Sequence, residues 1–342
     1  MSLPLRSSQQ LARLAHKLGV SIRVNPVDGI MNFCEQRISQ MMCDFPECAT
    51  PAEMLDCIAA KIGVVFEEVK SNDDLQQIIK KYAGMGEMGF VTLEEELSGE
   101  TFGITIKRHR REEWEPLYVA VIDCRGDKAA RAYYTKWHEV AHVLTLTDET
   151  RTSFRRTHSS QNGEDPEERM MDMIAGRLGF HPAMTSKFMR AYDEISFDVV
   201  DELREQLCPG ASRQASLINF ARFWPKPCIL VNAAMGLKRQ QEAVANQQGF
   251  FFHEGPKEEL RAVRVTRSDA AREVRFVVYP KWRVPEQSVI HKVYFGDTIY
   301  AEAMENLDWW EASSGSRLDS QPVLIRARRV MDCVDALIVP VH

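Results

Sequence analysis

Apolar and polar residues alternate with a helical period in the stretch R-A-Y-Y-T-K-W-H-E-V-A-H-V-L-T, residues 131–145. At about 100° per residue, four large side chains fall on one stripe of the predicted helix: Tyr133, Trp137, Val140 and Leu144. We expect this stripe to pack against a core. The opposite side carries two histidines together with Arg131 and Thr135, and we expect it to face a cleft.

The two histidines, His138 and His142, lie four positions apart in the sequence. Helical geometry therefore puts them on one face, about one turn apart. Two imidazoles in this arrangement can bind one metal ion, while Glu139 beside the first stays free to act as a general base. The alternative interpretation is a surface helix with two solvated histidines.

A second helix is predicted downstream, in the stretch D-P-E-E-R-M-M-D-M-I-A-G-R-L-G, residues 165–179. Asp165 suits the N-cap and Pro166 the first helical position. Glu168 and Asp172 lie four residues apart on one face of this helix. Zinc enzymes with two histidines commonly take a glutamate from a second helix as third ligand, and a carboxylate one turn later can accept the N–H of a ligating histidine. Alternatively, Glu168 closes a capping box with Asp165 and Asp172 is merely exposed.

Together, the two helices resemble the ImmA/IrrE metallopeptidases, whose pattern is R-x-x-F/Y-T-x-x-H-E-x-x-H followed by E-x-x-x-N/D-x-hydrophobic-A. The matching residues are Arg131, Tyr134, Thr135, His138, Glu139, His142, Glu168, Asp172, Ile174 and Ala175. The resemblance is strongest over residues 120–182 and continues more weakly on either side. The chain departs from the family at Trp137, where a small residue is usual, at Ala141, where glycine is frequent, and at Asp172, where asparagine is commoner.

The resemblance implies a minimal thermolysin-like, or zincin-like, zinc peptidase fold, and it implies action on DNA-binding repressors, here of the helix-turn-helix kind. In the predicted mechanism His138, His142 and Glu168 bind zinc, and Glu139 activates a zinc-bound water. Asp172 orients one ligating histidine. Manganese is the alternative metal, although two nitrogens and one carboxylate suit zinc best.

Two further side chains are candidates for assisting the oxyanion of the reaction. Tyr134 leans toward the metal side of its helix and is the better candidate. His158 lies in the polar segment 147–164, which joins the two motif helices. Long polar segments near a site are often mobile lids, but a solvated loop histidine is the plainer interpretation of His158.

The remaining pattern predicts an α+β protein of four parts. Residues 1–62 are predicted to be helical, and residues 63–182 to form the zincin-like metallopeptidase domain. Residues 183–224 are predicted to be a second helical segment, in which a helix-turn-helix is the alternative to core packing. Residues 225–342 mix strands and helices, typical of a small α+β domain. The radiation-response branch of the resembling family carries a GAF-like domain at this place, which suggests a sensory part.

Runs rich in apolar and β-branched residues predict the strands of both domains. In the metallopeptidase domain they cover residues 64–69, 89–93, 102–107 and 117–122. In the C-terminal domain they cover residues 228–232, 261–266, 273–279, 289–294 and 322–328, with helices expected at 233–244 and 297–307.

Composition and charge narrow the class of protein. The formal charge of −6 argues against a dedicated polyanion binder, so direct DNA binding is not predicted. No apolar run approaches the length of a membrane span, and residues 1–23 lack the apolar core of a signal peptide. The eight cysteines include no C-x-x-C, and their spacings suit neither a zinc knuckle nor a redox pair. We therefore expect a cytoplasmic protein with reduced thiols and no membrane partner.

The sequence thus predicts a zinc-dependent endopeptidase with a regulatory role, which cleaves a protein substrate such as a DNA-binding transcriptional repressor. The alternative, from a different class, is a non-catalytic regulator. Its metal site would only stabilise the fold, and its C-terminal domain would sense a ligand or partner. A DNA-binding protein that uses the helices near residues 198–223 is a second alternative. The sequence does not indicate the oligomeric state.

Overall fold

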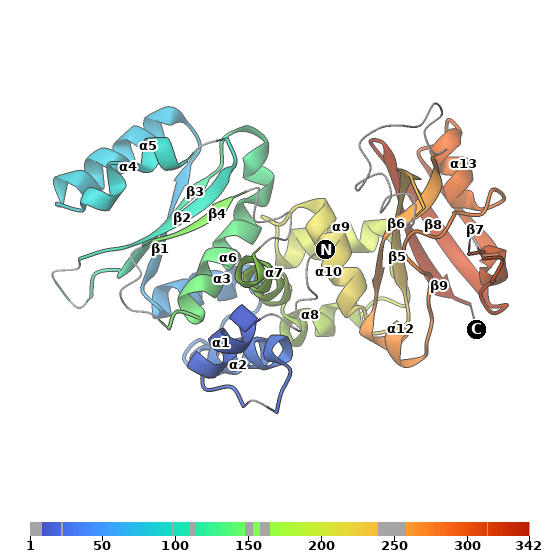
Figure 1. The fold of residues 1–342 in the computed structure, drawn as a ribbon, viewed down its shortest axis with the longest axis horizontal. Coiled ribbons are helices and arrows are strands. Elements are labelled where there is room, and N and C mark those ends of the chain that lie inside the picture. Colours follow the sequence, from blue (N-terminus) through green and yellow to red (C-terminus); the bar gives the residue numbers. More distant parts are fainter. Residues whose placement is uncertain are drawn as a thin grey trace. The chain divides into compact units, whose positions relative to one another are not determined.

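The chain is mixed α+β, as predicted, and divides into two compact units (Figure 1). The computed structural model describes residues 9–21, 23–97, 99–109, 112, 114–147, 153–157, 165–238, 258–312 and 314–341. The first unit comprises residues 1–185 and 204–216, and the second comprises residues 186–203 and 217–342. The predicted central helical segment, residues 183–224, therefore contributes to both units.

Three N-terminal helices open the first unit: α1 (Gln9–Lys17), α2 (Pro26–Met42) and α3 (Pro51–Lys61). Thr50 and Glu53 close a capping box at the start of α3. Helix α2 braces both motif helices, because Arg37 donates a hydrogen bond of 2.8 Å to the carbonyl of Leu144 and Glu35 pairs with Arg177. The N-terminal helices are thus part of the same compact unit as the motif.

A four-stranded sheet forms the centre of the first unit. Its strands are β1 (Val64–Val69), β2 (Thr101–Lys107), β3 (Tyr118–Asp123) and β4 (Ser153–Thr157). Their spatial order is β1-β3-β2-β4, with β1 parallel to β3 and the other pairs antiparallel. Among the described strands, β1 and β4 are therefore the edges of this sheet.

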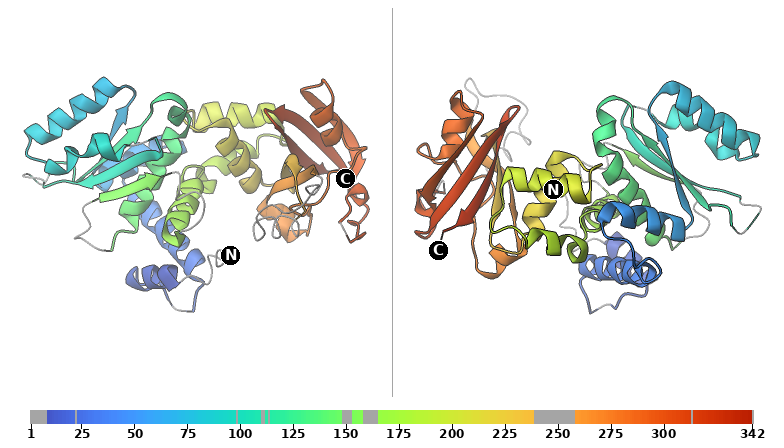
Figure 2. Two further views of the ribbon diagram at one scale, coloured as in Figure 1. Left: turned by 45° about the horizontal axis from the view of Figure 1, so that its top comes forward. Right: turned by 180° about the vertical axis from the view of Figure 1, so that it is seen from behind.

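Helices cover both faces of the sheet (Figures 1 and 2). On one face, α4 (Asn72–Gly84), the short helix η2 (Met88–Phe90) and α5 (Leu93–Glu96) bury their apolar residues against Ile104 and Ile106 of β2. On the other face lies α6 (Ala132–Leu144), which contacts β2 and β3. Side chains alternate between the two faces of a strand, so Gly103 and Thr105 of β2 point toward α6.

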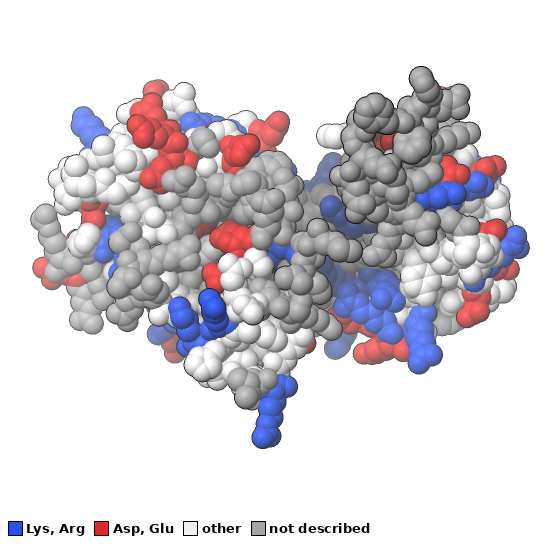
Figure 3. Space-filling view, in the orientation of Figure 1, with Lys and Arg blue, Asp and Glu red and all other residues white. Residues whose placement is uncertain are grey.

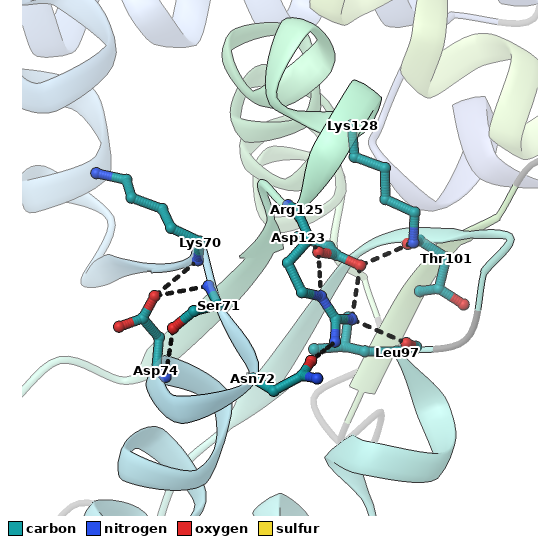
Figure 4. Close-up of polar contacts among 9 residues, drawn as sticks. All are labelled: Lys70, Ser71, Asn72, Asp74, Leu97, Thr101, Asp123, Arg125 and Lys128. Carbon is teal, nitrogen blue, oxygen red and sulfur yellow. Dashed lines mark hydrogen bonds and ion pairs between the residues drawn. The ribbon is translucent and has the colours of Figure 1, made fainter.

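A buried carboxylate fixes the turn that leads into α6 (Figure 4). Asp123, at the end of β3, is 1% exposed and pairs with Arg125 at 2.8 Å and with Lys128 at 2.7 Å. Arg125 also donates to the side chain of Asn72, and Lys128 donates to the carbonyl of Thr101. These bonds connect β3 to α4, to β2 and to the short helix η3 (Gly126–Arg131), which directly precedes α6. The position of the motif helix is thereby tied to the sheet.

Two predictions for the first unit are wrong. Residues 89–93 are not a strand: Phe90 ends η2, Leu93 begins α5, and both are fully buried three residues apart, which is a helical spacing. The polar segment 147–164 contains strand β4, whose backbone pairs with β2. A strand can form there without an apolar run, because strand pairing uses main-chain N–H and C=O groups. Every residue other than proline supplies both groups.

Helix α7 (Pro166–Leu178) carries the second part of the motif. After it come α8 (Pro182–Met189), α9 (Phe197–Leu207) and α10 (Arg213–Phe223), so the segment predicted at residues 183–224 is helical. On α10, Leu217, Phe220 and Ala221 are buried. Their burial favours core packing over a helix-turn-helix at this place.

The second unit is built on a five-stranded antiparallel sheet. Its strands are β5 (Ile229–Gly236), β6 (Glu259–Arg267), β7 (Tyr300–Asn306), β8 (Pro322–Val330) and β9 (Cys333–Pro340). The spatial order is β6-β5-β9-β8-β7. Two short helices, α12 (Asp269–Glu273) and α13 (Val289–Phe295), bury residues in the same apolar core as the sheet.

The sequence misassigned several elements of this unit. Residues 289–294 form α13 rather than a strand, because Ser288 caps them and Val289, Ile290 and Val293 are buried at helical spacing. Residues 300–306, expected in a helix, form β7, and strand β9 was missed. Of residues 273–279 none is in a strand. Residues 233–236, expected to begin a helix, belong to strand β5, which continues to Gly236. Residues 239–244 lie outside the described part of the chain.

Two further observations bear on the sequence predictions. All eight cysteines are free thiols, but the Sγ atoms of Cys48 and Cys57 lie 2.7 Å apart beside α3. The spacing of the cysteines gave no sign of this pair, because the turn before α3 brings the two together.

Within the described residues, no helix combines the length and the apolar character that crossing a bilayer requires.

Candidate metal centre

The apolar stripe of α6 is buried as predicted: Tyr133, Trp137, Val140 and Leu144 are at most 7% exposed. Trp137 is accommodated by Gly179, the residue that ends α7. A Cβ on Gly179 would lie 3.0 Å from Cδ1 of Trp137, and its φ of −64° is ordinary helical backbone. This glycine is therefore needed for space beside Trp137 rather than for an unusual turn, and it explains how the large residue fits.

The histidine side of α6 is more deeply buried than the open cleft that the sequence predicted, although His142 lines a cavity. His138, Glu139 and Thr135 are at most 1% exposed, and His142 is 5% exposed. Strand β2 and helix α7 both pack against this side of α6. Periodicity identifies the polar face of a helix, but it does not show that the chain itself supplies polar partners to cover that face.

The three predicted ligands converge from α6 and α7. The Nε2 atoms of His138 and His142 lie 3.0 Å apart. Glu168 places Oε2 at 3.2 Å from the first nitrogen and Oε1 at 3.4 Å from the second. Ligands at 2.0–2.1 Å from a tetrahedral zinc ion lie about 3.3 Å from each other. The donor atoms of this group thus have types and separations that could hold one metal ion.

Asp172 occupies the position predicted for a carboxylate behind a ligand. Its Oδ1 lies 2.8 Å from Nδ1 of His138. In the tautomer whose Nδ1–H donates to Asp172, Nε2 of a neutral ring carries no proton and is available as a metal ligand. A cation between Nε2 and the carboxylate of Glu168 would suit this tautomer. The second carboxylate thus favours a metal-binding tautomer.

Glu168 is ionised in this environment. Burial alone would raise its pKa, but the contacts with His138 and His142 outweigh burial and hold the pKa well below the ordinary range of a glutamate. The N-cap of α7 is made by Asp165, whose carboxylate accepts the N–H of Glu167. Glu168 is therefore not used in a capping box, and its carboxylate is committed to the two histidines.

Glu139 lies beside the three predicted ligands. One of its carboxylate oxygens accepts a hydrogen bond, and the other has no partner among the described residues. The hydroxyl of Thr105 on β2 donates a hydrogen bond of 2.6 Å to its Oε2. Among the described residues, Oε1 is buried and has no hydrogen-bond partner. A buried carboxylate oxygen without a partner is costly unless it has a function. Thr105 fixes the orientation of this carboxylate. The sequence does not indicate this role, because a threonine in a strand carries no distinctive signal.

Gly103 provides the space next to that oxygen. A Cβ at this position would lie 2.7 Å from Cγ2 of Thr135 and 3.1 Å from Oε1 of Glu139. The glycine stands inside strand β2, where glycine usually marks a bulge or a close approach, and the pairing of β2 with β4 shifts register between Thr101 and Gly103. The glycine inside a predicted strand is visible in the sequence. The sequence does not show that α6 approaches it.

We expect the substitution Gly103→Ala to destabilise the first unit by about 1–3 kcal/mol, the usual cost of overpacking a well-packed site. The added methyl group must displace either Thr135 or the carboxylate of Glu139. Chemical denaturation of the parent and the variant measures this difference. Gly99→Ala is the matched control, because a Cβ there meets no atom within 4 Å; equal losses in the two variants would contradict the close approach.

Two predicted site residues remain, Tyr134 and His158. The hydroxyl of Tyr134 donates to the main-chain carbonyl of Asp172, so it links α6 to α7 directly behind the ligands. A catalytic part for Tyr134 stays a prediction. His158 lies outside the residues that the structure describes.

Comparison with known proteins gives no match. No protein-family model matches the chain, and no curated protein matches it either.

Proposed function

We propose that this protein is a zinc-dependent endopeptidase with a regulatory role, whose substrate is a DNA-binding repressor of the helix-turn-helix kind. The observation that carries the proposal is the convergence of His138, His142 and Glu168 next to the unpartnered oxygen of Glu139. The resemblance of these segments to the ImmA/IrrE metallopeptidases supports a zincin-like domain and the repressor as substrate.

His138, His142 and Glu168 would hold the metal ion, with zinc preferred over manganese because the donor set is two imidazoles and one carboxylate. A bound zinc ion would supply Lewis-acid chemistry, lowering the pKa of a water molecule and polarising the peptide carbonyl. Asp172 fixes the tautomer of His138 by accepting a hydrogen bond from Nδ1–H. The tautomer keeps Nε2 available as a ligand.

Glu139 performs the proton transfers. Its Oε1 accepts the proton of the attacking water, and the same carboxyl group later delivers that proton to the nitrogen of the leaving amine. Thr105 holds Oε2, so the carboxylate keeps one orientation during both transfers. The nearby space at Gly103 lets Oε1 stay unblocked.

The edge strand β4 is suited to binding an extended peptide. It pairs with β2 on one side only among the described strands, and Phe154 lies opposite Thr105 in the register. Peptides commonly bind by adding a strand to such an edge, with main-chain hydrogen bonds as the source of affinity. A peptide on β4 would thus run past the carboxylate that Thr105 holds.

A second candidate function is favoured by the C-terminal domain. There a cavity of about 670 Å³ is lined by Arg261, which is only 2% exposed, together with Arg283 and Trp309. Trp310, by contrast, belongs to the apolar core. A cavity of this size lies within the range of ligand-binding sites, about 300–1,000 Å³. It supports a sensory, GAF-like role for residues 225–342, either beside the peptidase activity or in a non-catalytic regulator.

Incubation with a helix-turn-helix repressor, with and without a chelator, separates these candidates. We expect zinc-loaded protein to convert the repressor into two fragments whose masses add to the parent mass plus one water, and we expect the chelator to abolish this. Intact repressors in every zinc-loaded reaction, despite stoichiometric zinc, would instead favour the non-catalytic regulator.

A further inference from the structure

A cavity of about 380 Å³ adjoins the candidate metal centre on the side of helix α1. We call it the α1 cavity. Its wall is formed by one face of α1, by His142 and Thr145 at the end of α6, and by Glu167 and Met171 at the start of α7. His142 also belongs to the candidate metal centre, so the α1 cavity and that centre share this side chain.

Helix α1 is held in place by its apolar face. Leu11 and Ala15 are at most 5% exposed, and the helix packs on α2 and α7. Arg13 and Lys17 lie on the face that lines the cavity, four residues apart and therefore on the same side. The packing of α1 thus presents two cations to the space beside the metal ligand.

Both cations are exposed, and neither forms an ion pair with a residue that the structure describes. The space-filling view shows basic side chains gathered beside α1 (Figure 3). Among the lining residues that the structure describes, Glu167 contributes the one carboxylate. Two positive charges and one negative charge give these described residues a net positive charge. Met171 and Leu14 add apolar surface that suits the methylene groups of a side chain.

We infer that the α1 cavity is a specificity subsite that binds an aspartate or glutamate side chain of the substrate, next to the scissile bond. The inference rests on the proposed peptidase function, since the cavity gains its meaning from the adjacent metal centre. Arg13 and Lys17 supply the charge that attracts the substrate carboxylate. The cavity holds a single side chain and its flanking main chain rather than a folded domain. The subsite would therefore select acidic positions in an extended peptide.

The probes for this subsite are short peptides that carry a metal-binding hydroxamate. In one series the hydroxamate stands at the C-terminal end and in the other at the N-terminal end, so that side chains extend to either side of the metal. Each series has a Glu, a Gln and a Lys version. Calorimetry measures their binding to the full-length, zinc-loaded chain. This readout is independent of catalysis.

We expect the Glu probe to bind about tenfold more tightly than the Gln probe in one series, which is what two partly solvated ion pairs provide. The double variant Arg13→Gln/Lys17→Gln should remove that preference, and each single variant should remove part of it. Lys80→Gln is the matched control, because Lys80 is an exposed lysine of α4 that does not line the cavity. Glu167→Gln should act in the opposite direction and strengthen binding of the Glu probe about twofold to threefold.

The outcomes distinguish the subsite from the peptidase itself. Equal binding of the Glu and Gln probes in both series overturns the subsite and leaves the metal centre intact. A preference that survives in the double variant overturns the role of the two cations. If no hydroxamate binds the zinc-loaded parent, the metal is not accessible, and the subsite and the proposed function fail together. The zinc content and melting temperature of each variant verify that it is folded.

Discussion

The variant Glu139→Gln is expected to bind zinc with the affinity of the parent and to lose repressor cleavage by about a thousandfold or more. Glu139 is not among the three converging ligands, so its amide analogue leaves the metal site intact. The amide cannot accept the proton of the attacking water, and general acid–base catalysis typically contributes about 10²–10⁴ in rate. Single-turnover cleavage with excess enzyme measures the loss.

Zinc titration of Glu139→Gln is the control for this result, since a loss of activity with a loss of metal would have a different cause. Thr105→Val is an informative companion, because it removes only the hydrogen bond to Oε2 of Glu139. Cleavage by Glu139→Gln at the parental rate would exclude Glu139 as the general base.

The second large effect is expected for Glu168→Ala, which should weaken zinc binding by more than about a hundredfold. Loss of an outer-shell partner alone costs about 10–100-fold in metal affinity, and Glu168 is itself one of the three converging donors. Competition with a chromophoric chelator measures the affinity. Glu167→Ala is the matched control, because this neighbouring glutamate in the same turn of α7 does not belong to the donor group.

The zinc affinity of Asp172→Ala should lie between those of Glu168→Ala and Glu167→Ala. Asp172 contacts His138 but is not itself one of the three converging donors. Equal zinc affinity of Glu168→Ala and Glu167→Ala would show that Glu168 does not contribute a ligand.

The sequence predicted which side chains converge, because their spacing is local. His138 and His142 share one helix, Glu168 and Asp172 share the next, and the four-residue spacing within each helix determines which side chains lie together. The packing of the two helices is the only long-range step. The apolar stripe of α6 indicated the side that faces the core, which leaves the other side for α7.

The partners of Glu139 could not be predicted in the same way. Thr105 and Gly103 come from strand β2, more than thirty residues before Glu139. Their approach depends on which face of the sheet α6 covers, which no local pattern determines. For the same reason, the sequence did not show that β2 and α7 bury the histidines.

The C-terminal domain was predicted least accurately, because short apolar runs suit both strands and helices. Residues 289–294 contain V-I-H-K-V-Y, a β-branched run that nevertheless forms α13 after the cap at Ser288. Strand β7 contains alanines, glutamates and a methionine, which favour helices in isolation, yet it pairs with β8. In both cases capping or sheet pairing outweighed the intrinsic propensity of the residues.

Zinc K-edge X-ray absorption of the zinc-loaded, full-length protein tests the convergence of the three side chains most directly. We expect one zinc ion per chain with two imidazole nitrogens at about 2.0–2.1 Å and carboxylate or water oxygens at about 2.0–2.2 Å. A spectrum dominated by sulfur at about 2.3 Å would assign the metal to the cysteines instead. That result, or a chain that retains no zinc, would contradict the site formed by His138, His142 and Glu168.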